Sequence, residues 1–526
     1  MVKRITNRDK IKSSLVTAVG YLLPKSKSPD EGLGQLFTDV QKRRLYNDGK
    51  TFADLIPRSN AKQMLQEYEL VKGSPAFDLS EFIDRNFYDL STIQTNREPI
   101  ADLKQTITQY ISNSWDMLER RNRRDKGSLI ALPYAYIVPG GRFNEQFYWD
   151  SYFIMLGLES EGRWGMIEGM IKNFAYMLRK FGHIPNANRT YFISRSQPPF
   201  FSHMVKLLSR HKGKIALVEY LPYLLIEYRF WMKGVSKLTK QQDQVYARLV
   251  KMNDGVYLNR YFDDKTTPRP ESLREDIETA SKASEGDIGR IYSNLRSGAE
   301  SGWDFSSRWL VDPSDIRTIN TSDIIPIDLN CLLYQLEMTI AEAYQVIRQP
   351  LLVRKFKNLA SRRLSAVNKY CWNDNLGYFM DYDYRLGHQT AHVTLAGVFP
   401  LYANMATDDQ AAKVALIIEN DFLKNGGLIT TLIKDSQQWD YPNGWAPLHH
   451  VVIEGLRNYG YNQLADMIKK RWIATNAKVY EKQNKLVEKY NVVNVDDSAH
   501  GGEYPLQVGF GWTNGVLESL MAETEA

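Results

Sequence analysis

The sequence predicts an all-α toroid of helical hairpins, and three observations lead to this fold class. Apolar residues recur at helical spacing in one stretch after another. Sustained strand alternation is scarce. Several helical stretches follow a loop rich in Gly, Pro, Trp and Asp, which places polar chemistry at the helix starts. A toroid of helical hairpins brings many helix N-termini to one end, while the outer helices return the chain. The mouth at that end suits a hydroxyl-rich ligand, which can meet convergent side chains and helix-start N–H groups.

The expected helices follow one another along the whole chain. They cover residues 33–46, 103–118, 166–177, 221–231, 329–340 and 451–456. The polar loops at residues 149–150, 325–328, 443–445 and 511–514 precede helices, and small hairpins are expected at 255–258 and 377–382. We therefore predict an N-terminal arm (1–98) wrapped on the main domain, a catalytic domain (99–520) and a C-terminal tail (521–526).

The composition is that of a soluble globular protein, with 43% hydrophobic and 24% charged residues among 526. A net charge of +6 is a small excess over 67 basic and 61 acidic residues, so we expect no nucleic-acid partner. No stretch approaches the length of a membrane span, and we expect no membrane partner and a monomer. Two cysteines, Cys331 and Cys371, make no disulfide framework.

The N-terminus has the residue order of a signal peptide, because basic residues precede a mildly apolar run at 15–23. The run is short and contains Thr17, Gly20 and Tyr21, and no small-x-small cleavage site follows it. We therefore predict a cytoplasmic location. A periplasmic or secreted protein is the alternative if the run acts as a signal.

Charged residues interleave with aromatics in the stretch 139–152, where Arg142, Glu145 and Asp150 stand among Phe143 and Trp149. This pattern suits either a pocket for a polyhydroxylated ligand or a buried structural ion pair. The same chemistry recurs at 300–309, 438–447 and 501–512.

Cleavage of a glycosidic bond needs two carboxyl groups, one as an acid and one as a base or nucleophile. The sequence offers five candidates in these loops, and residue chemistry alone does not choose among Asp150, Asp304, Asp440, Glu488 and Glu503.

The recurring segments, from about Pro139 to Asn514, resemble the signature motifs of the trehalases, which are inverting hydrolases that split α,α-trehalose into two glucoses. The resemblance implies a six-hairpin (α/α)6 barrel and α,α-trehalase activity on a small-molecule substrate, trehalose, with no cofactor. Alternatives are a toroid hydrolase for another glucoside and a catalytically impaired trehalose-binding sensor. Retention of both carboxylates expected for catalysis argues against the sensor.

The resemblance also assigns the two catalytic carboxyl groups. Asp304, in Gly302-Trp303-Asp304-Phe305, matches the general acid, and Glu488, in Leu486-Val487-Glu488-Lys489-Tyr490, matches the general base. Desolvation by the aromatic neighbours of Asp304 is expected to raise its pKa and keep a proton available. Glu488 taken alone is typical of a solvated face.

The implied substrate-binding residues come from the same motifs. They are Arg142, Trp149, Asp150, Asn186, Arg195, Ser196, Gln197, Arg269, Pro270, Glu271, Gly302 and Glu503. Three arginines suit a neutral sugar, because each guanidinium offers five fixed donors.

One departure from the family pattern is Ser498-Ala499-His500-Gly501-Gly502, where trehalases usually carry a longer glycine run that resembles a lid. Residues other than glycine rarely adopt positive φ. The replacement of glycines in this segment therefore puts the motion of the lid and the turnover rate in doubt. No metal motif is present: adjacent His449 and His450 would point to different sides of a helix.

Overall fold

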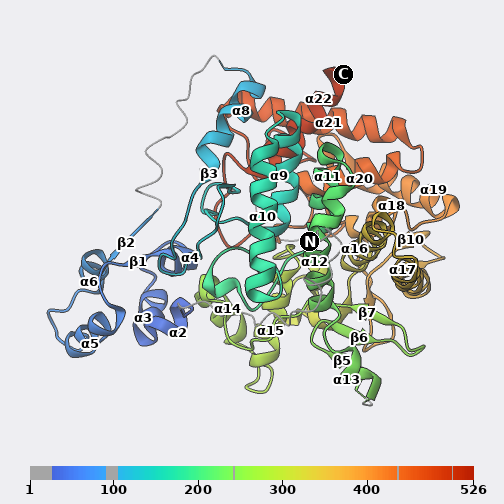
Figure 1. Cartoon of the computed structure of the whole chain (residues 1–526). Coiled ribbons are helices and arrows are strands. Elements are labelled where there is room, and N and C mark those ends of the chain that lie inside the picture. The colour runs from blue at the N-terminus through green and yellow to red at the C-terminus, as the bar shows by residue number, and fades with distance from the viewer. Residues whose placement is uncertain (1–26, 91–104, 241–242, 435–436, 500, 526) are drawn as a thin grey trace, which may run out of the picture.

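A computed structural model describes residues 27–90, 105–240, 243–434, 437–499 and 501–525, and paired helices dominate it (Figure 1). The inner helices are α9 (Tyr148–Ser160), α11 (Phe201–Lys212), α16 (Ile327–Val346), α18 (Phe399–Tyr402), α20 (Ala446–Arg457) and α22 (Gly511–Glu525). The outer helices are α8 (Ile107–Leu118), α10 (Trp164–Phe181), α12 (Ile215–Trp231), α17 (Pro350–Cys371), α19 (Asp408–Ile417) and α21 (Asn462–Gln483).

The inner helices form a closed ring. Each one packs against the next in chain order, and α22 closes the ring by packing along α9. Inner and outer helices alternate along the chain, from α8 before α9 to α21 before α22, so each outer helix returns the chain to the next inner one. The described residues thus form the toroid of helical hairpins that the sequence predicts.

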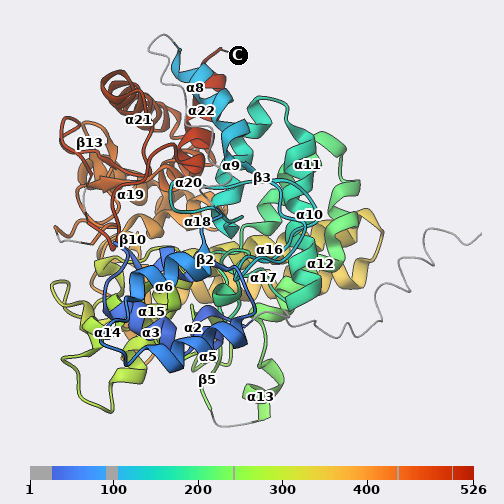
Figure 2. The same cartoon turned by 90° about the vertical axis from the view of Figure 1, so that its left-hand side faces the viewer.

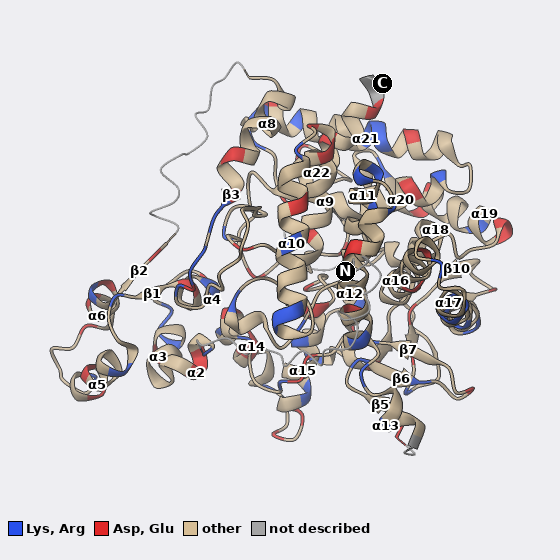
Figure 3. Cartoon of the chain, in the orientation of Figure 1, with Lys and Arg blue, Asp and Glu red and all other residues tan. Residues whose placement is uncertain are grey.

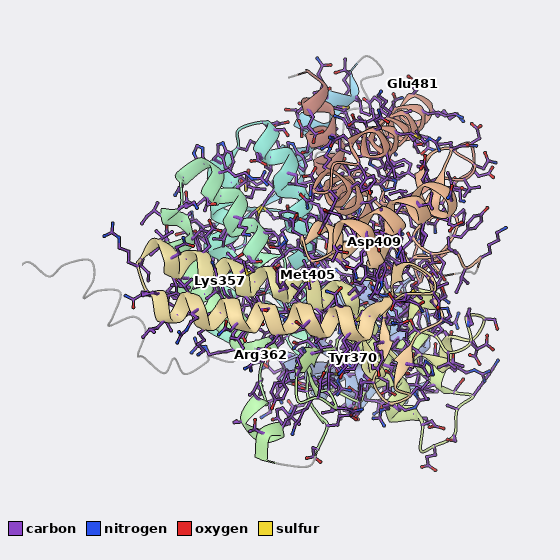
Figure 4. The ribbon with its side chains drawn as sticks, turned by 90° about the vertical axis from the view of Figure 1, so that its right-hand side faces the viewer. Lys357, Arg362, Tyr370, Met405, Asp409 and Glu481 are labelled. Carbon is purple, nitrogen blue, oxygen red and sulfur yellow. The ribbon has the colours of Figure 1, made fainter. Side chains whose placement is uncertain are left out.

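Burial separates inner from outer helices. All residues of α9 from Tyr148 to Leu158 are buried, so this helix is enclosed on every side. In α17 the buried residues recur every three to four positions, and Lys357 and Arg362 are exposed. Figure 4 views the molecule from the side on which α17 lies, with these two residues labelled.

The strands are short and antiparallel, and they decorate the loops between helices. The pairs are β1 (Ile56–Pro57) with β2 (Phe87–Tyr88), β3 (Glu119–Arg120) with β4 (Tyr136–Ile137), β9 (Trp372–Asn373) with β10 (Tyr378–Phe379), β13 (Leu423–Lys424) with β14 (Gly427–Leu428), and β15 (Asn443–Gly444) with β16 (Tyr490–Asn491). The three-stranded sheets are β5 (Val245–Tyr246), β6 (Leu249–Lys251), β7 (Tyr257–Asn259), and β8 (Ile324–Ile325), β11 (Tyr382–Asp383), β12 (His388–Gln389).

Residues 27–90 form an arm of short helices on one side of the toroid (Figure 2). They are α2 (Pro29–Leu33), α3 (Gln35–Lys42), α4 (Gly49–Asp54), α5 (Ala61–Val71) and α6 (Leu79–Asn86). The arm has its own apolar core, which includes Phe37 and Phe82 and reaches Phe147 and Phe192 of the toroid. Additional helices α13 (Val235–Lys240), α14 (Leu273–Ala280) and α15 (Ile288–Glu300) lie between α12 and α16 in the chain.

Most of the helices expected from the sequence coincide with helices of the structure. The helices expected within 103–118, 166–177, 221–231, 329–340 and 451–456 fall on α8, α10, α12, α16 and α20, although residues 103–104 lie outside the described ranges. The helix expected at 33–46 is instead split into α2 and α3 by Gly34, which has φ 53°. The second helix, α3, ends at Lys42.

The domain division stays a prediction, and its boundary at residue 520 falls inside α22. The expected hairpins lie at β6–β7 and β9–β10. Basic and acidic residues are interspersed over the elements (Figure 3). Among the helices that the structure describes, none is long and apolar enough to cross a membrane.

Candidate active site

Polar loops that precede the inner helices line a pocket of about 90 Å³. Of the sequence-predicted site residues, those that line it are Arg142, Trp149, Asp150, Asn186, Arg195, Gln197, Arg269, Glu271, Gly302, Asp304, Glu488 and Glu503. Ser196 is buried behind the wall, where its hydroxyl donates to the carbonyl of Ile184 at 2.7 Å. Pro270 is buried at the start of a single 3-10 turn, Pro270–Ser272, and does not line the pocket either.

Asp304 is a half-buried carboxyl whose pKa is raised to about 7. Desolvation is the main cause, and the charge of Arg269 opposes it. Gly302, two residues earlier, has φ 73°, and a Cβ there would lie 2.8 Å from the ring of Trp149. The glycine therefore lets the chain bring Asp304 against the aromatic wall.

Glu488 lies in the segment between α21 and β16, and its side chain is buried, with a relative exposure of 1%. Pairing of β16 with β15, Gly444 opposite Tyr490, ties this segment to the start of α20. Tyr504 donates its hydroxyl to Oε1 of Glu488 at 2.9 Å. Oε2 is buried and has no hydrogen-bond partner among the described residues. One oxygen is thus fixed and the other is left to bind a ligand.

Several environmental effects act on the carboxyl group of Glu488. Burial raises its pKa, and the ammonium of Lys489, the Tyr504 hydrogen bond and the charge of Arg142 lower it in part. These three partners favour the ionised form, which a base requires.

Asp150 is a third carboxyl in the pocket, in the first turn of α9. Desolvation raises its pKa to about 8, and the nearby charges of Glu488 and Asp304 add to the shift. Carboxyl groups this close titrate as a coupled set. Some of these carboxyl groups therefore remain protonated at neutral pH.

The arginines are held by acidic partners. Arg269 pairs with Asp276 at 2.6 Å and with Glu503 at 2.8 Å, and Arg195 pairs with Glu271. Nε and Nη1 of Arg195 are buried and donate no hydrogen bond to any residue that the structure describes. These N–H groups can donate to sugar hydroxyls.

An aromatic wall faces the carboxyl groups. Trp439 stacks on Trp445 with ring centroids 3.9 Å apart, and Trp303 stacks on Trp439 at 5.3 Å. Trp149 lies 5.9 Å from Trp439. Such a wall excludes water and gives the pocket an apolar side.

The segment that follows the departure from the family glycine run covers the pocket. Glu503 accepts hydrogen bonds from Arg269 at 2.8 Å and from the hydroxyl of Ser272 at 2.9 Å. Lys489 donates to the carbonyl of Gly501 at 3.1 Å. Gly501 and Gly502 both have positive φ, at 83° and 103°. The two remaining glycines thus occupy positions that require them, while His500 lies outside the described residues.

Other lining residues did not emerge as binding residues from the sequence. Lys50 of the arm is buried against the pocket, where its ammonium donates to Glu145 at 3.0 Å and to the carbonyl of Arg142 at 3.2 Å. Its local sequence carries no sign of this role. Gln438, Trp439, Trp445, Tyr504, Phe510 and Trp512 also line the pocket, and the aromatic loops that hold them were the available indication. No cluster of three or more metal-ligating side chains occurs within the described ranges.

Comparison with known proteins identifies similar chains. The trehalase family model matches residues 44–525. Periplasmic trehalases of Salmonella agona (strain SL483) and Salmonella paratyphi B are each 47% identical over 495 residues, which cover 94% of this chain and 86% of theirs.

Solved structures agree with the observed architecture. Neutral trehalase Nth1 from Saccharomyces cerevisiae is similar with a TM-score of 0.62 and 27% identity over 80% of each chain. A GH63 mannosylglycerate hydrolase from Thermus thermophilus is similar in fold, with a TM-score of 0.52 and 17% identity, over 79% of this chain and 100% of that one. The (α/α)6 toroid predicted from the sequence is confirmed.

The predicted cytoplasmic location is wrong. The 47% identical relatives are named periplasmic trehalases, which points to the periplasm. The error came from treating Thr17, Gly20 and Tyr21 as too polar for a signal; these residues lie outside the described ranges.

Proposed function

Because the chain belongs to the trehalase family, we propose that it hydrolyses α,α-trehalose to two molecules of D-glucose in the periplasm, with Asp304 as general acid and Glu488 as general base. The reaction consumes one water and leaves no covalent intermediate. It proceeds with inversion at the attacked carbon. We also propose that the enzyme acts as a monomer.

The acid role of Asp304 is supported by the desolvation that raises its pKa. A pKa raised to about 7 keeps a substantial protonated fraction at neutral pH, whereas an ordinary aspartate is almost fully ionised there. The proton goes to the glycosidic oxygen as the bond to the attacked carbon breaks. Arg269 then stabilises the aspartate that forms, because its charge acts on this carboxyl.

The base role of Glu488 is supported by the different states of its two oxygens, and this observation carries the proposal. Oε1 accepts the Tyr504 hydroxyl, which fixes the plane of the carboxylate. Oε2 has no partner among the described residues, and a buried acceptor left unpaired is unfavourable. A water bound there donates one proton to Oε2 as its oxygen attacks the anomeric carbon.

The remaining polar groups bind the sugar hydroxyls. Arg195 offers N–H groups that make no hydrogen bond among the described residues, and Asp150 and Glu503 offer carboxyl oxygens to donors on the substrate. Trp439 and Trp445 line the pocket and offer apolar contact to the sugars. No observation favours the sensor alternative, which requires neither a proton on Asp304 nor a free oxygen on Glu488.

The direct test is glucose release from trehalose by the purified chain. We expect two glucoses for each trehalose consumed, and no release from disaccharides that lack the α,α-1,1 linkage. Binding of trehalose without glucose release would favour the sensor. Release from another glucoside at a higher kcat/KM would favour the other toroid hydrolase.

A further inference from the structure

A second cavity, of about 250 Å³, lies along the inner ring away from the proposed active site. Each inner helix of the described toroid contributes to its lining, through Tyr152, His203, Gln335, Tyr402, His450 and Ser519. Further lining residues, such as Glu159, Arg210 and Glu523, come from the last turns of these helices. Since the helix starts hold the proposed active site, this axial cavity belongs to the opposite mouth of the toroid.

The floor of the axial cavity is aromatic. His203 and Tyr402 stack with ring centroids 5.4 Å apart, and the hydroxyls of Tyr152 and Tyr402 share a hydrogen bond at 3.2 Å. His450 packs against Tyr152 at 5.9 Å. Burial lowers the pKa of His203 to about 3 and that of His450 to about 4, so both rings are neutral at pH 7.

The aromatic floor also separates the two cavities. Phe200 stacks on Tyr152 at 5.1 Å and lies 6.3 Å from Trp149, a wall residue of the proposed active site. The ring of Phe200 therefore lies between Tyr152, which lines the axial cavity, and Trp149, which lines the proposed active site. Both Tyr152 and Trp149 belong to α9.

Polar groups without partners face this cavity. The side chains of Lys206, Gln335 and His450 make no hydrogen bond to any part of the chain that the structure describes, and all three line the cavity. His450 is 8% exposed, and burial lowers the pKa of Lys206. Lys206 and Gln335 are half-buried, and their side chains are free to donate to a ligand or to water in the cavity.

The charged residues that line the axial cavity indicate which kind of ligand it can bind. Three carboxylates (Glu159, Glu454 and Glu523) and two cations (Lys206 and Arg210) line the cavity, so the lining residues carry no excess of positive charge. The carboxylates are already paired: Glu159 accepts from Arg210 at 3.4 Å, and Arg457 binds Glu454 at 3.0 Å and Glu523 at 2.9 Å. A neutral ligand with several hydroxyls matches such a lining of paired charges, amides and aromatics.

We propose that the axial cavity is a second binding site, which takes a neutral monosaccharide such as D-glucose. Its space exceeds that of the proposed active-site pocket, about 250 against about 90 Å³. Lys206 and Gln335 donate hydrogen bonds to sugar hydroxyls, and His450 accepts one through the unprotonated nitrogen of its neutral ring. This inference depends on the cavity alone and holds whichever glycoside the protein hydrolyses.

Equilibrium dialysis against radiolabelled D-glucose tests the proposal. The double variant Lys206→Met, Gln335→Leu removes two unpaired donors and keeps side-chain size. Lys212→Met is the matched control, because Lys212 lies on the same helix and pairs with Glu168 on the outside, at 2.6 Å. At saturation, wild type and control should bind one glucose more per chain than the double variant. Equal binding by all three proteins would overturn the proposal.

A cavity-filling variant, Ser519→Phe, gives an independent result if the double variant does not fold. It should also bind one glucose fewer than wild type, and its kcat on trehalose should stay within about twofold of wild type. Undiminished glucose binding by a folded Ser519→Phe protein would equally overturn the axial site. Trehalose hydrolysis by wild type, measured in parallel, reports on the proposed function separately.

Discussion

Tyr504 donates its hydroxyl to Oε1 of Glu488 at 2.9 Å, so the segment that covers the pocket also orients the proposed base. The neighbouring residue of this segment, Glu503, is held by Arg269. The same segment therefore lines the pocket and holds the proposed base.

Tyr504→Phe removes the hydrogen bond that lowers the pKa of Glu488. Glu488 must be ionised to accept a proton, and a higher pKa leaves less of the ionised form at acidic pH. We expect kcat/KM at pH 5 to fall about tenfold or more, since hydrogen bonds to charged groups are worth about 1.5–3 kcal/mol. The acid limb of the pH profile should move to higher pH.

The control for this variant is Tyr459→Phe, which removes a hydroxyl that donates to the carbonyl of Ala406 at 2.8 Å outside the pocket. Its pH profile should match that of wild type. An acid limb that stays in place in Tyr504→Phe would contradict the role of Tyr504.

Asp304→Asn should abolish activity without unfolding the protein. The amide cannot deliver a proton, and general-acid catalysis is typically worth ~10²–10⁴-fold in kcat. Because the folded-state pKa of Asp304 is raised to about 7, ionisation of this group opposes folding as pH rises above its unfolded-state pKa. The Tm at pH 8 should therefore equal or exceed that of wild type. More than a tenth of wild-type turnover would refute the assignment.

The pH profile of the wild-type enzyme should have a basic limb near neutrality. The proposed acid works only when protonated, and the pKa of Asp304 is about 7, so kcat/KM should fall as pH rises from 7 to 9. Asp150, with a pKa of about 8, is coupled to this titration, and the apparent value belongs to the set. Constant kcat/KM over this range would rule out a titrating acid in the free enzyme.

Activity should survive exhaustive chelation. The proposed mechanism uses carboxyl groups alone, and no metal-ligating cluster occurs in the described part of the chain. Dialysis against EDTA, followed by a trehalose assay in metal-free buffer, should leave kcat within about twofold of the untreated value. Loss of activity with recovery on adding a divalent cation would refute the carboxylate-only site.

The stereochemistry of the products tests the role of Glu488 as a base. Inversion at one of the two α-linked carbons of trehalose yields one β-glucose, while the departing glucose stays α. Proton NMR within the first minutes, before mutarotation, should show equal α and β signals. Two α-glucoses at the earliest times would indicate retention, with Glu488 as a nucleophile or without a chemical role.

The sequence alone predicted much of the fold and part of the chemistry. Apolar spacing located helices such as α12 and α16, because a helix that packs on a core repeats its contacts every three to four residues. The flanking Trp303 and Phe305 correctly indicated a raised pKa for Asp304, since desolvation by adjacent residues is a local property. The resemblance to trehalases supplied the number of hairpins, six, and the assignment of Asp304 as the acid and Glu488 as the base.

Tertiary structure decided what depends on contacts between distant segments. Glu488 resembles a solvated residue in its own sequence, yet the β15–β16 pairing and Tyr504 bury it in the pocket. Lys50 reaches the same pocket from the arm, 95 residues before its partner Glu145. Residue spacing reports only which face of a local element is apolar. Which distant side chains meet there is set by how the ring of helices closes, so these partners emerged only from the folded chain.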